Sequence, residues 1–130
     1  MLSRLFLLAA GGAAGTLARY GVSVWADRAA RGVFPAGTMA VNLAGCFLIG
    51  ALWALFERSL ISPGQRLFLM TGFLGGFTTF STFGLETFSL MRDGEYWAAA
   101  LNAAVNNIAG VGLVLAGFFC VNFIMGKVSA

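Results

Sequence analysis

The sequence predicts an all-α membrane protein with four transmembrane helices and a break in the third. Of its 130 residues, 59% are hydrophobic and only 10% are charged. Soluble domains are roughly 45–50% apolar and about 25% charged, so this chain lacks the polar residues needed to cover a water-facing surface. The charges also separate four apolar stretches. Each of these is long enough to cross a bilayer, which takes about 20 residues.

The four spans are expected at about 3–26, 33–56, 66–91 and 96–126, within one transmembrane domain that covers residues 1–130. Inside residues 5–26 the one charged residue is Arg19, and inside 67–91 it is Glu86. Residues 32–56 and 96–126 carry no charge. The polar separators are of hairpin length, so the helices should run alternately up and down.

The basic residues divide almost evenly between the two ends of such a bundle. One side carries Arg4, Arg58, Arg66 and Lys127, and the other carries Arg28, Arg31, Arg92 and, if the first helix ends near the interface, Arg19. Orientation in a membrane follows the excess of Lys and Arg, which is nearly absent here. Either other determinants fix one orientation, or the chain inserts both ways. The balance favours the second reading, a dual-topology antiparallel homodimer.

The size of the chain also favours an oligomer, because four helices enclose too little interior for a solvated path. Small residues let helix backbones approach closely in lipid. The candidates for such faces are Gly11, Gly12, Gly15, Gly37, Gly45 and Gly50.

The residue types present exclude several classes of function. The chain has no His, and its two cysteines, Cys46 and Cys120, lie far apart in apolar stretches. These residues offer neither a metal site built on His and Cys nor a nucleophile–base pair, so no enzyme is predicted. The basic residues are scattered rather than clustered, so nucleic acid is not an expected partner.

The third span concentrates polar groups where lipid would surround them. Its centre places Gly75 and Gly76 just before Thr78 and Thr79, and this combination makes poor helix. We therefore expect a break. Broken backbone at membrane depth is tolerated where it packs in protein or lines a cavity, and its freed carbonyls are natural ligands for a small cation.

Beyond the expected break, Phe80 and Phe83 should share one face of the resumed helix, beside the hydroxyls of Ser81 and Thr82. Aromatic rings have electropositive edges, and hydroxyls donate hydrogen bonds, a combination that suits a small dehydrated anion. The alternative is that the rings are packing residues and that the hydroxyls bond back to their own helix.

Three amides form two further polar sites inside the spans. Asn42 lies in the second span, and Asn102 and Asn106 are four residues apart on the fourth. Each site is either a pore wall or an interhelical hydrogen bond that holds the bundle together. Of the two ionisable groups, Arg19 either reaches the interface or gives a vestibule a positive field, and interface exposure is expected for Glu86.

The stretch GGFTTFSTF at 75–83 resembles the Fluc family of bacterial fluoride channels, also called CrcB or camphor-resistance proteins. The resemblance extends to GGxxGxxxRY at 11–20 and to GTxxxNL at 37–43, and it covers essentially the whole chain. One departure is that Asn102 and Asn106 stand where some members have Tyr and Ser.

The resemblance implies a dual-topology antiparallel homodimer with two fluoride pathways, in the bacterial inner membrane. It implies a sodium ion at the centre of the dimer, held by the backbone carbonyls of Gly75 and Thr78. It also implies a set of pore residues: Asn42, Phe80, Phe83, Ser81, Thr82 and Arg19. Further members of a polar track would be Thr38, Glu86, Asn102 and Asn106.

The sequence therefore predicts a multi-pass membrane channel that exports cytoplasmic fluoride passively. One alternative is a small dual-topology multidrug transporter, which needs a membrane-embedded carboxylate, and here only Glu86 is embedded. Another is a membrane assembly subunit that transports nothing.

Overall fold

The computed structural model describes residues 1–30 and 32–128, so Arg31, one of the basic residues weighed for topology, lies outside it. Within these residues, four helical stretches are long and apolar enough to cross a membrane. They are Leu2–Ala30, Ala36–Glu57, Pro63–Arg92 and Tyr96–Lys127. The prediction of an all-α protein with four membrane helices is confirmed.

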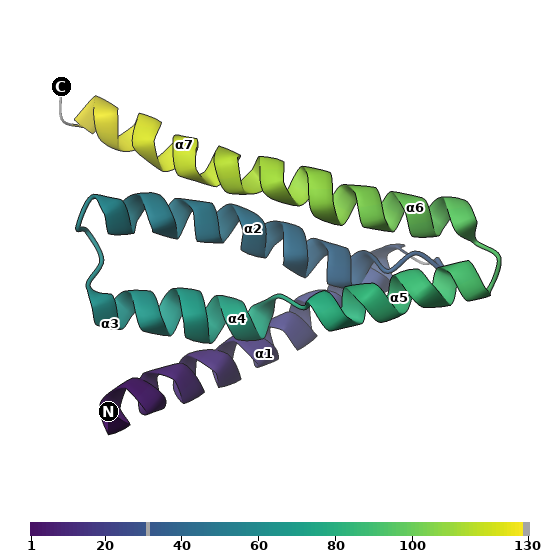
Figure 1. Ribbon diagram of the computed structural model, residues 1–130, viewed down its shortest axis with the longest axis horizontal. Helices are drawn as coiled ribbons and strands as arrows, with labels where there is room; N and C mark the ends of the chain where they lie inside the picture. The colour runs from purple at the N-terminus through teal and green to yellow at the C-terminus, as the bar shows by residue number, and fades with distance from the viewer. Residues whose placement is uncertain (31, 129–130) are drawn as a thin grey trace.

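The first two spans are single helices, α1 (Leu2–Ala30) and α2 (Ala36–Glu57). The third consists of α3 (Pro63–Arg66), the π-helix η1 (Leu67–Leu74), α4 (Gly75–Phe77) and α5 (Phe80–Arg92). The fourth consists of α6 (Tyr96–Ala104), the π-helix η2 (Val105–Ala109) and α7 (Gly110–Val128). The start of α1, the end of α7 and the α2–α3 loop lie at one end of the bundle, and the third span is interrupted near its middle (Figure 1).

The third span begins with a capping box, which the sequence SPGQ encodes. Ser62 Oγ accepts a hydrogen bond of 3.3 Å from the Gln65 N–H, and Gln65 Oε1 accepts one of 2.8 Å from the Ser62 N–H. Pro63 occupies the first helical position, where its missing N–H costs nothing. The start of the span is thereby fixed relative to the polar loop.

Glycine determines how the spans pack. α2 lies along α7, and α1 lies along η1 and α4. A Cβ at Gly50 would strike the carbonyl of Val114, and one at Gly15 would strike the carbonyl of Phe73. The glycine faces that we expected to support an oligomer are thus used between helices of one chain, because bare backbone lets the spans approach.

A small buried core adjoins the break in the third span. Val41 of α2, Leu74 of η1 and Phe77 of α4 form it, and each is less than a tenth exposed. This cluster anchors the first part of the third span against α2 just before the chain straightens.

Candidate functional site

The break in the third span falls on its two threonines. Thr78 (φ −83°, ψ 159°) and Thr79 (φ −151°, ψ 116°) are both extended, whereas Gly75 and Gly76 stay helical. The Thr78 N–H still donates to the Leu74 carbonyl at 3.0 Å, and so does its hydroxyl, at 2.9 Å. The predicted break is present, and the β-branched residues carry it rather than the glycines.

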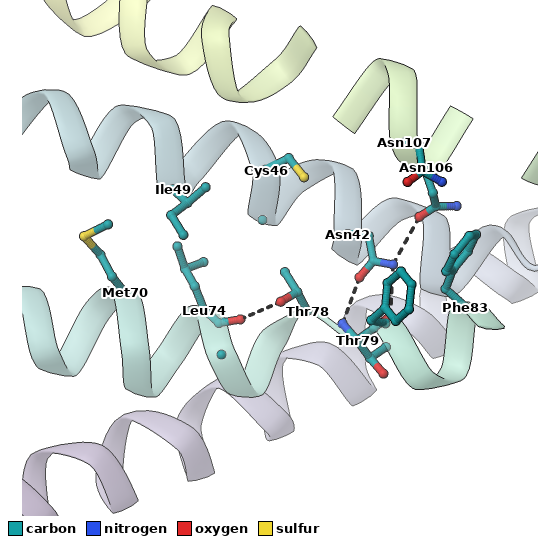
Figure 2. A pocket seen from close by; sticks show the side chains of 13 residues that line it. Asn42, Cys46, Ile49, Met70, Leu74, Thr78, Thr79, Phe83, Asn106 and Asn107 are labelled. Carbon is teal, nitrogen blue, oxygen red and sulfur yellow. Dashed lines mark hydrogen bonds between the residues drawn. The ribbon is translucent and has the colours of Figure 1, made fainter. Parts of the chain in front are cut away.

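Asn42 of α2 bridges the broken backbone. Its Oδ1 accepts a hydrogen bond of 2.8 Å from the Thr79 N–H, and its Nδ2 donates one of 3.1 Å to the Thr79 carbonyl (Figure 2). One amide thus satisfies both main-chain groups of a residue that no longer belongs to a helix. Asn42 therefore makes at least an interhelical hydrogen bond, which is the second of its two interpretations.

Thr79 also begins α5. Its side-chain oxygen accepts a hydrogen bond of 3.3 Å from the Thr82 N–H, which is the ordinary role of an N-cap residue. Its hydroxyl donates to Thr82 Oγ1 at 2.9 Å. The Thr82 hydroxyl is thereby oriented at the first turn of α5.

These bonds remove the usual partners of two carbonyls. In a continuous helix the Thr79 N–H would donate to the Gly75 carbonyl, and the Thr82 N–H to the Thr78 carbonyl. Here the first donates to Asn42 Oδ1 and the second to Thr79 Oγ1. Gly75 is exposed, and nothing lies within 4 Å of the position that its Cβ would occupy. The chemistry at both carbonyls fits oxygen ligation of a small cation.

A cavity of about 340 Å³ opens beside the break. Its polar lining includes Asn42, Thr79 and Asn106, and its aromatic lining is Phe80 and Phe83 (Figure 2). A second cavity, of about 320 Å³, is lined by several predicted residues. These are Arg19, Thr38, Thr82 and Glu86, together with Thr79. Since Thr79 lines both cavities, the broken backbone stands between them.

The two phenylalanines differ sharply in exposure. Phe83 is 8% exposed and Phe80 is 79% exposed, with ring centroids 5.4 Å apart and ring planes tilted by 52°. Phe80 thus has little packing within its own chain. Ser81 is exposed and lines neither cavity, so the structure does not bring it together with the other predicted residues.

Glu86 is tied to α2 rather than free at the interface. The buried hydroxyl of Thr38 donates a hydrogen bond of 2.7 Å to Glu86 Oε1. Glu86 Oε2 is buried and has no partner among the described residues. We expected Glu86 to be exposed at the interface, but its side chain is only partly exposed because it turns inward to Thr38. Arg19 is half-buried and shares the second cavity with it.

Sequence reasoning missed several polar residues near the site, among them Thr79, which lines both cavities, and Thr87. The Thr87 hydroxyl donates to the Phe83 carbonyl at 2.8 Å and accepts from Asn102 Nδ2 at 2.9 Å. Asn102 is completely buried. The available signal was spacing, because Thr87 follows Phe83 by four residues and so lies on the same face of α5.

Comparison with known proteins agrees with this architecture. A relative from Salinibacter ruber, "Fluoride-specific ion channel FluC", is 45% identical over 123 residues, which are 95% of this chain and 92% of the relative. A relative of the same name from Parabacteroides distasonis is 47% identical over 124 residues, or 95% and 93% of the two chains. A third, from Desulfotalea psychrophila, is 46% identical over 115 residues, or 88% and 89%.

The family profile described as "CrcB-like protein, Camphor Resistance (CrcB)" matches residues 6–118, which include all four spans in whole or in large part. The resemblance predicted from the motifs at 11–20, 37–43 and 75–83 is confirmed. This multi-pass membrane protein belongs to the CrcB family, a family of channels rather than enzymes.

Proposed function

We propose that this chain forms a fluoride-selective channel that lets cytoplasmic fluoride leave passively. One observation carries the proposal. The Asn42 amide is held at a break in the middle of a membrane span, on a cavity that Phe80 and Phe83 also line. Amide donors and ring edges are both electropositive, so this cavity offers an anion favourable contacts inside the membrane. The names of the relatives from Salinibacter ruber and Parabacteroides distasonis support fluoride as the anion.

Fluoride is small and strongly hydrated, so a pore must replace its water with donors. The donors that we propose are the Asn42 amide, the Thr82 hydroxyl and the edges of Phe80 and Phe83, residues that line the two cavities. Among the described residues, Arg19 supplies the one basic side chain of the second cavity, whose lining also includes the carboxylates of Asp27 and Glu86. In acid surroundings HF crosses the bilayer and dissociates in the more alkaline cytoplasm, and a conduit then returns fluoride down its gradient without an energy source.

The functional unit that we propose is an antiparallel homodimer with two pores. The even division of basic residues supports insertion in both orientations. Phe80 supports a partner, because a ring that is 79% exposed and contacts the Phe83 ring has little packing within its own chain. In the dimer, Phe80 would face the pore of the neighbouring subunit or the interface.

A sodium ion fits the centre of this dimer. The carbonyls of Gly75 and Thr78 would hold it, since both lose their helical donors at the break. The ion would supply fixed positive charge and would tie the two broken spans together. Replacing sodium with a large organic cation should then dissociate or inactivate the dimer, and full flux with an unchanged elution volume would contradict this part of the proposal.

Flux from liposomes tests the channel itself. Purified protein in liposomes loaded with fluoride should release fluoride when a potassium ionophore balances the charge, and liposomes loaded with chloride should retain their anion. Absence of fluoride release, or equal chloride release, would overturn the proposal. Transport of a cationic drug in exchange for protons, without fluoride release, would instead favour the multidrug transporter. In that case Glu86 would be the carboxylate that carries the proton.

Cysteine labelling tests the topology. In a background without Cys46 and Cys120, single cysteines at Leu60 and Glu95 mark the two ends of the bundle, and both positions are exposed. A membrane-impermeant reagent should label each position partly from outside and partly from inside. Labelling of either position from one side alone would contradict dual topology.

A further inference from the structure

Asn106 is the second partner of the Asn42 amide, and it joins the break to the fourth span. Asn42 Nδ2 donates a hydrogen bond of 3.1 Å to Asn106 Oδ1, in addition to its bond of 3.1 Å to the Thr79 carbonyl (Figure 2). An amide nitrogen carries two hydrogens. Both donors of Asn42 are therefore engaged, although the cavity beside them is open to an ion.

The hydrogen bonds continue beyond Asn106 and return to α5. Asn106 Nδ2 donates to the main-chain carbonyl and to Oδ1 of Asn102, each at 3.0 Å. Asn102 Nδ2 donates to Thr87 Oγ1 at 2.9 Å, and Thr87 Oγ1 donates to the Phe83 carbonyl at 2.8 Å. We call this series, from the Thr79 N–H to the Phe83 carbonyl, the amide relay.

The direction of the amide relay is fixed at both ends. A main-chain N–H can only donate and a main-chain carbonyl can only accept. The Thr79 N–H therefore requires an oxygen from Asn42, and the Phe83 carbonyl requires the hydroxyl hydrogen of Thr87. If the Asn106 amide were reversed, its nitrogen would face Asn42 Nδ2 and its oxygen would face the Asn102 carbonyl. The first contact would then have two donors and no acceptor, and the second would have two acceptors and no hydrogen.

We infer that Asn106 is a positioning residue for the pore, whose carbonyl oxygen occupies an Asn42 N–H until an anion displaces it. The inference rests on the proposed function. A passing anion needs a donor at Asn42, and the competing acceptors there are the Thr79 carbonyl and Asn106 Oδ1. The Thr79 carbonyl is a main-chain group, and its residue is held a second time by the bond from the Thr79 N–H to the same Asn42 amide. Asn106 Oδ1, a side-chain atom, is the acceptor that can move away.

The alternation of Asn106 Oδ1 and an anion at the Asn42 N–H helps a bound ion to leave the pore. A buried N–H without a partner costs about 1–3 kcal/mol, so an Asn42 donor without Asn106 would hold a bound anion too well. A carbonyl that takes over the N–H when the ion departs lowers that cost. Asn102 orients the Asn106 amide for this role. Two oxygen atoms of Asn102 accept hydrogen bonds from Asn106 Nδ2, so Asn106 Oδ1 points toward Asn42.

The test is the concentration dependence of fluoride current in reconstituted dimers. Asn106→Leu removes the competing acceptor, so the half-saturating fluoride concentration should fall about fivefold, the equivalent of one hydrogen bond of about 1 kcal/mol. The maximal current should fall as well, because release is slower. Asn106→Ala also removes the acceptor without adding bulk, so the half-saturating concentration should fall in this variant too.

Asn122→Leu is the control. This amide of α7 lines neither cavity and accepts a hydrogen bond of 2.9 Å from Arg58 Nε, so its loss should leave the half-saturating concentration unchanged. A merely structural role for Asn106 would lower the maximal current without lowering the half-saturating concentration.

The outcomes separate this inference from the proposed function. Fluoride current in the wild type with an unchanged or raised half-saturating concentration in Asn106→Leu would overturn the inference alone. If Asn106→Leu does not assemble, an unchanged or raised half-saturating concentration in Asn106→Ala would overturn it. Absence of fluoride current in the wild type would overturn the proposed function and the inference together.

Discussion

Asp27 Oδ1 accepts a hydrogen bond of 2.7 Å from the main-chain N–H of Gly37. Gly37 is the second residue of α2, and its N–H is one of those that a helix start leaves without a partner. A Cβ at this position would lie 2.6 Å from Asp27 Oδ2 and 2.8 Å from the carbonyl oxygen of Ser23. One carboxylate thus joins the end of the first span to the start of the second, and the contact requires glycine.

Removing this carboxylate should loosen the first turn of α2. Asp27→Ala is expected to lower the free energy of unfolding by about 1 kcal/mol, as for other lost helix caps. Thermal unfolding of the detergent-solubilised protein measures the change. Asp93→Ala is the control, since Asp93 lies on the exposed turn after α5 and pairs with Arg92 beside it. Equal shifts in both variants would contradict the role of Asp27.

The contact between α2 and α7 should be equally sensitive to a single methyl group. Gly50→Ala places a Cβ against the Val114 carbonyl, and overpacking of this kind costs about 1–3 kcal/mol. We expect a lower unfolding temperature and less monodisperse protein. Gly112→Ala on α7 is the matched control, because nothing lies within 4 Å of its Cβ position. A normal unfolding temperature for Gly50→Ala would show that α2 and α7 can move apart without loss of stability.

Much of this architecture could be predicted from the sequence, because lipid imposes simple demands. Apolar stretches between charges predicted the four spans, and Thr78 and Thr79 among glycines predicted the break. The motif at 75–83 predicted the family. These signals are local, since each depends on residues that are close together in the chain.

The pairing of polar groups could not be predicted in the same way. Asn42 meets Thr79 across 37 positions, and Thr38 meets Glu86 across 48. Such partners depend on how the spans rotate against each other, which glycine contacts and the π-helical turns of η1 and η2 determine. A sequence shows that a buried amide needs a partner, but only the packing decides which one it finds.

Phe80 offers a test of the aromatic lining. Phe80→Ile removes a ring edge while it keeps much of the bulk, so fluoride efflux should fall roughly tenfold or more, equivalent to about 1.4 kcal/mol or more at the barrier. The dimer should elute unchanged on gel filtration. Phe88→Ile is the control, since Phe88 is an exposed ring on the same helix, α5, that lines neither cavity. Unchanged efflux in Phe80→Ile would reduce Phe80 to a packing residue.

Asn42→Ala should impair both conduction and stability. It leaves the Thr79 N–H and carbonyl without their amide partner, at a cost of about 1–3 kcal/mol for each buried group. We expect efflux to fall to the level of empty liposomes and the unfolding temperature to drop. Asn122→Ala serves as the comparison, because its amide pairs with Arg58 and lines neither cavity. Normal efflux with lowered stability would assign Asn42 to the bundle and not to the pore.

Splitting the third span at Thr78 and Thr79 also changes its electrostatics. A continuous helix has one dipole, whose poles of roughly half a charge lie at the two membrane surfaces. The break gives two shorter dipoles in series. The negative pole of the segment ending at Phe77 and the positive pole of α5 then face each other near the middle of the span. A single polypeptide thereby presents, a few residues apart and far from both membrane surfaces, one end that attracts cations and one that attracts anions.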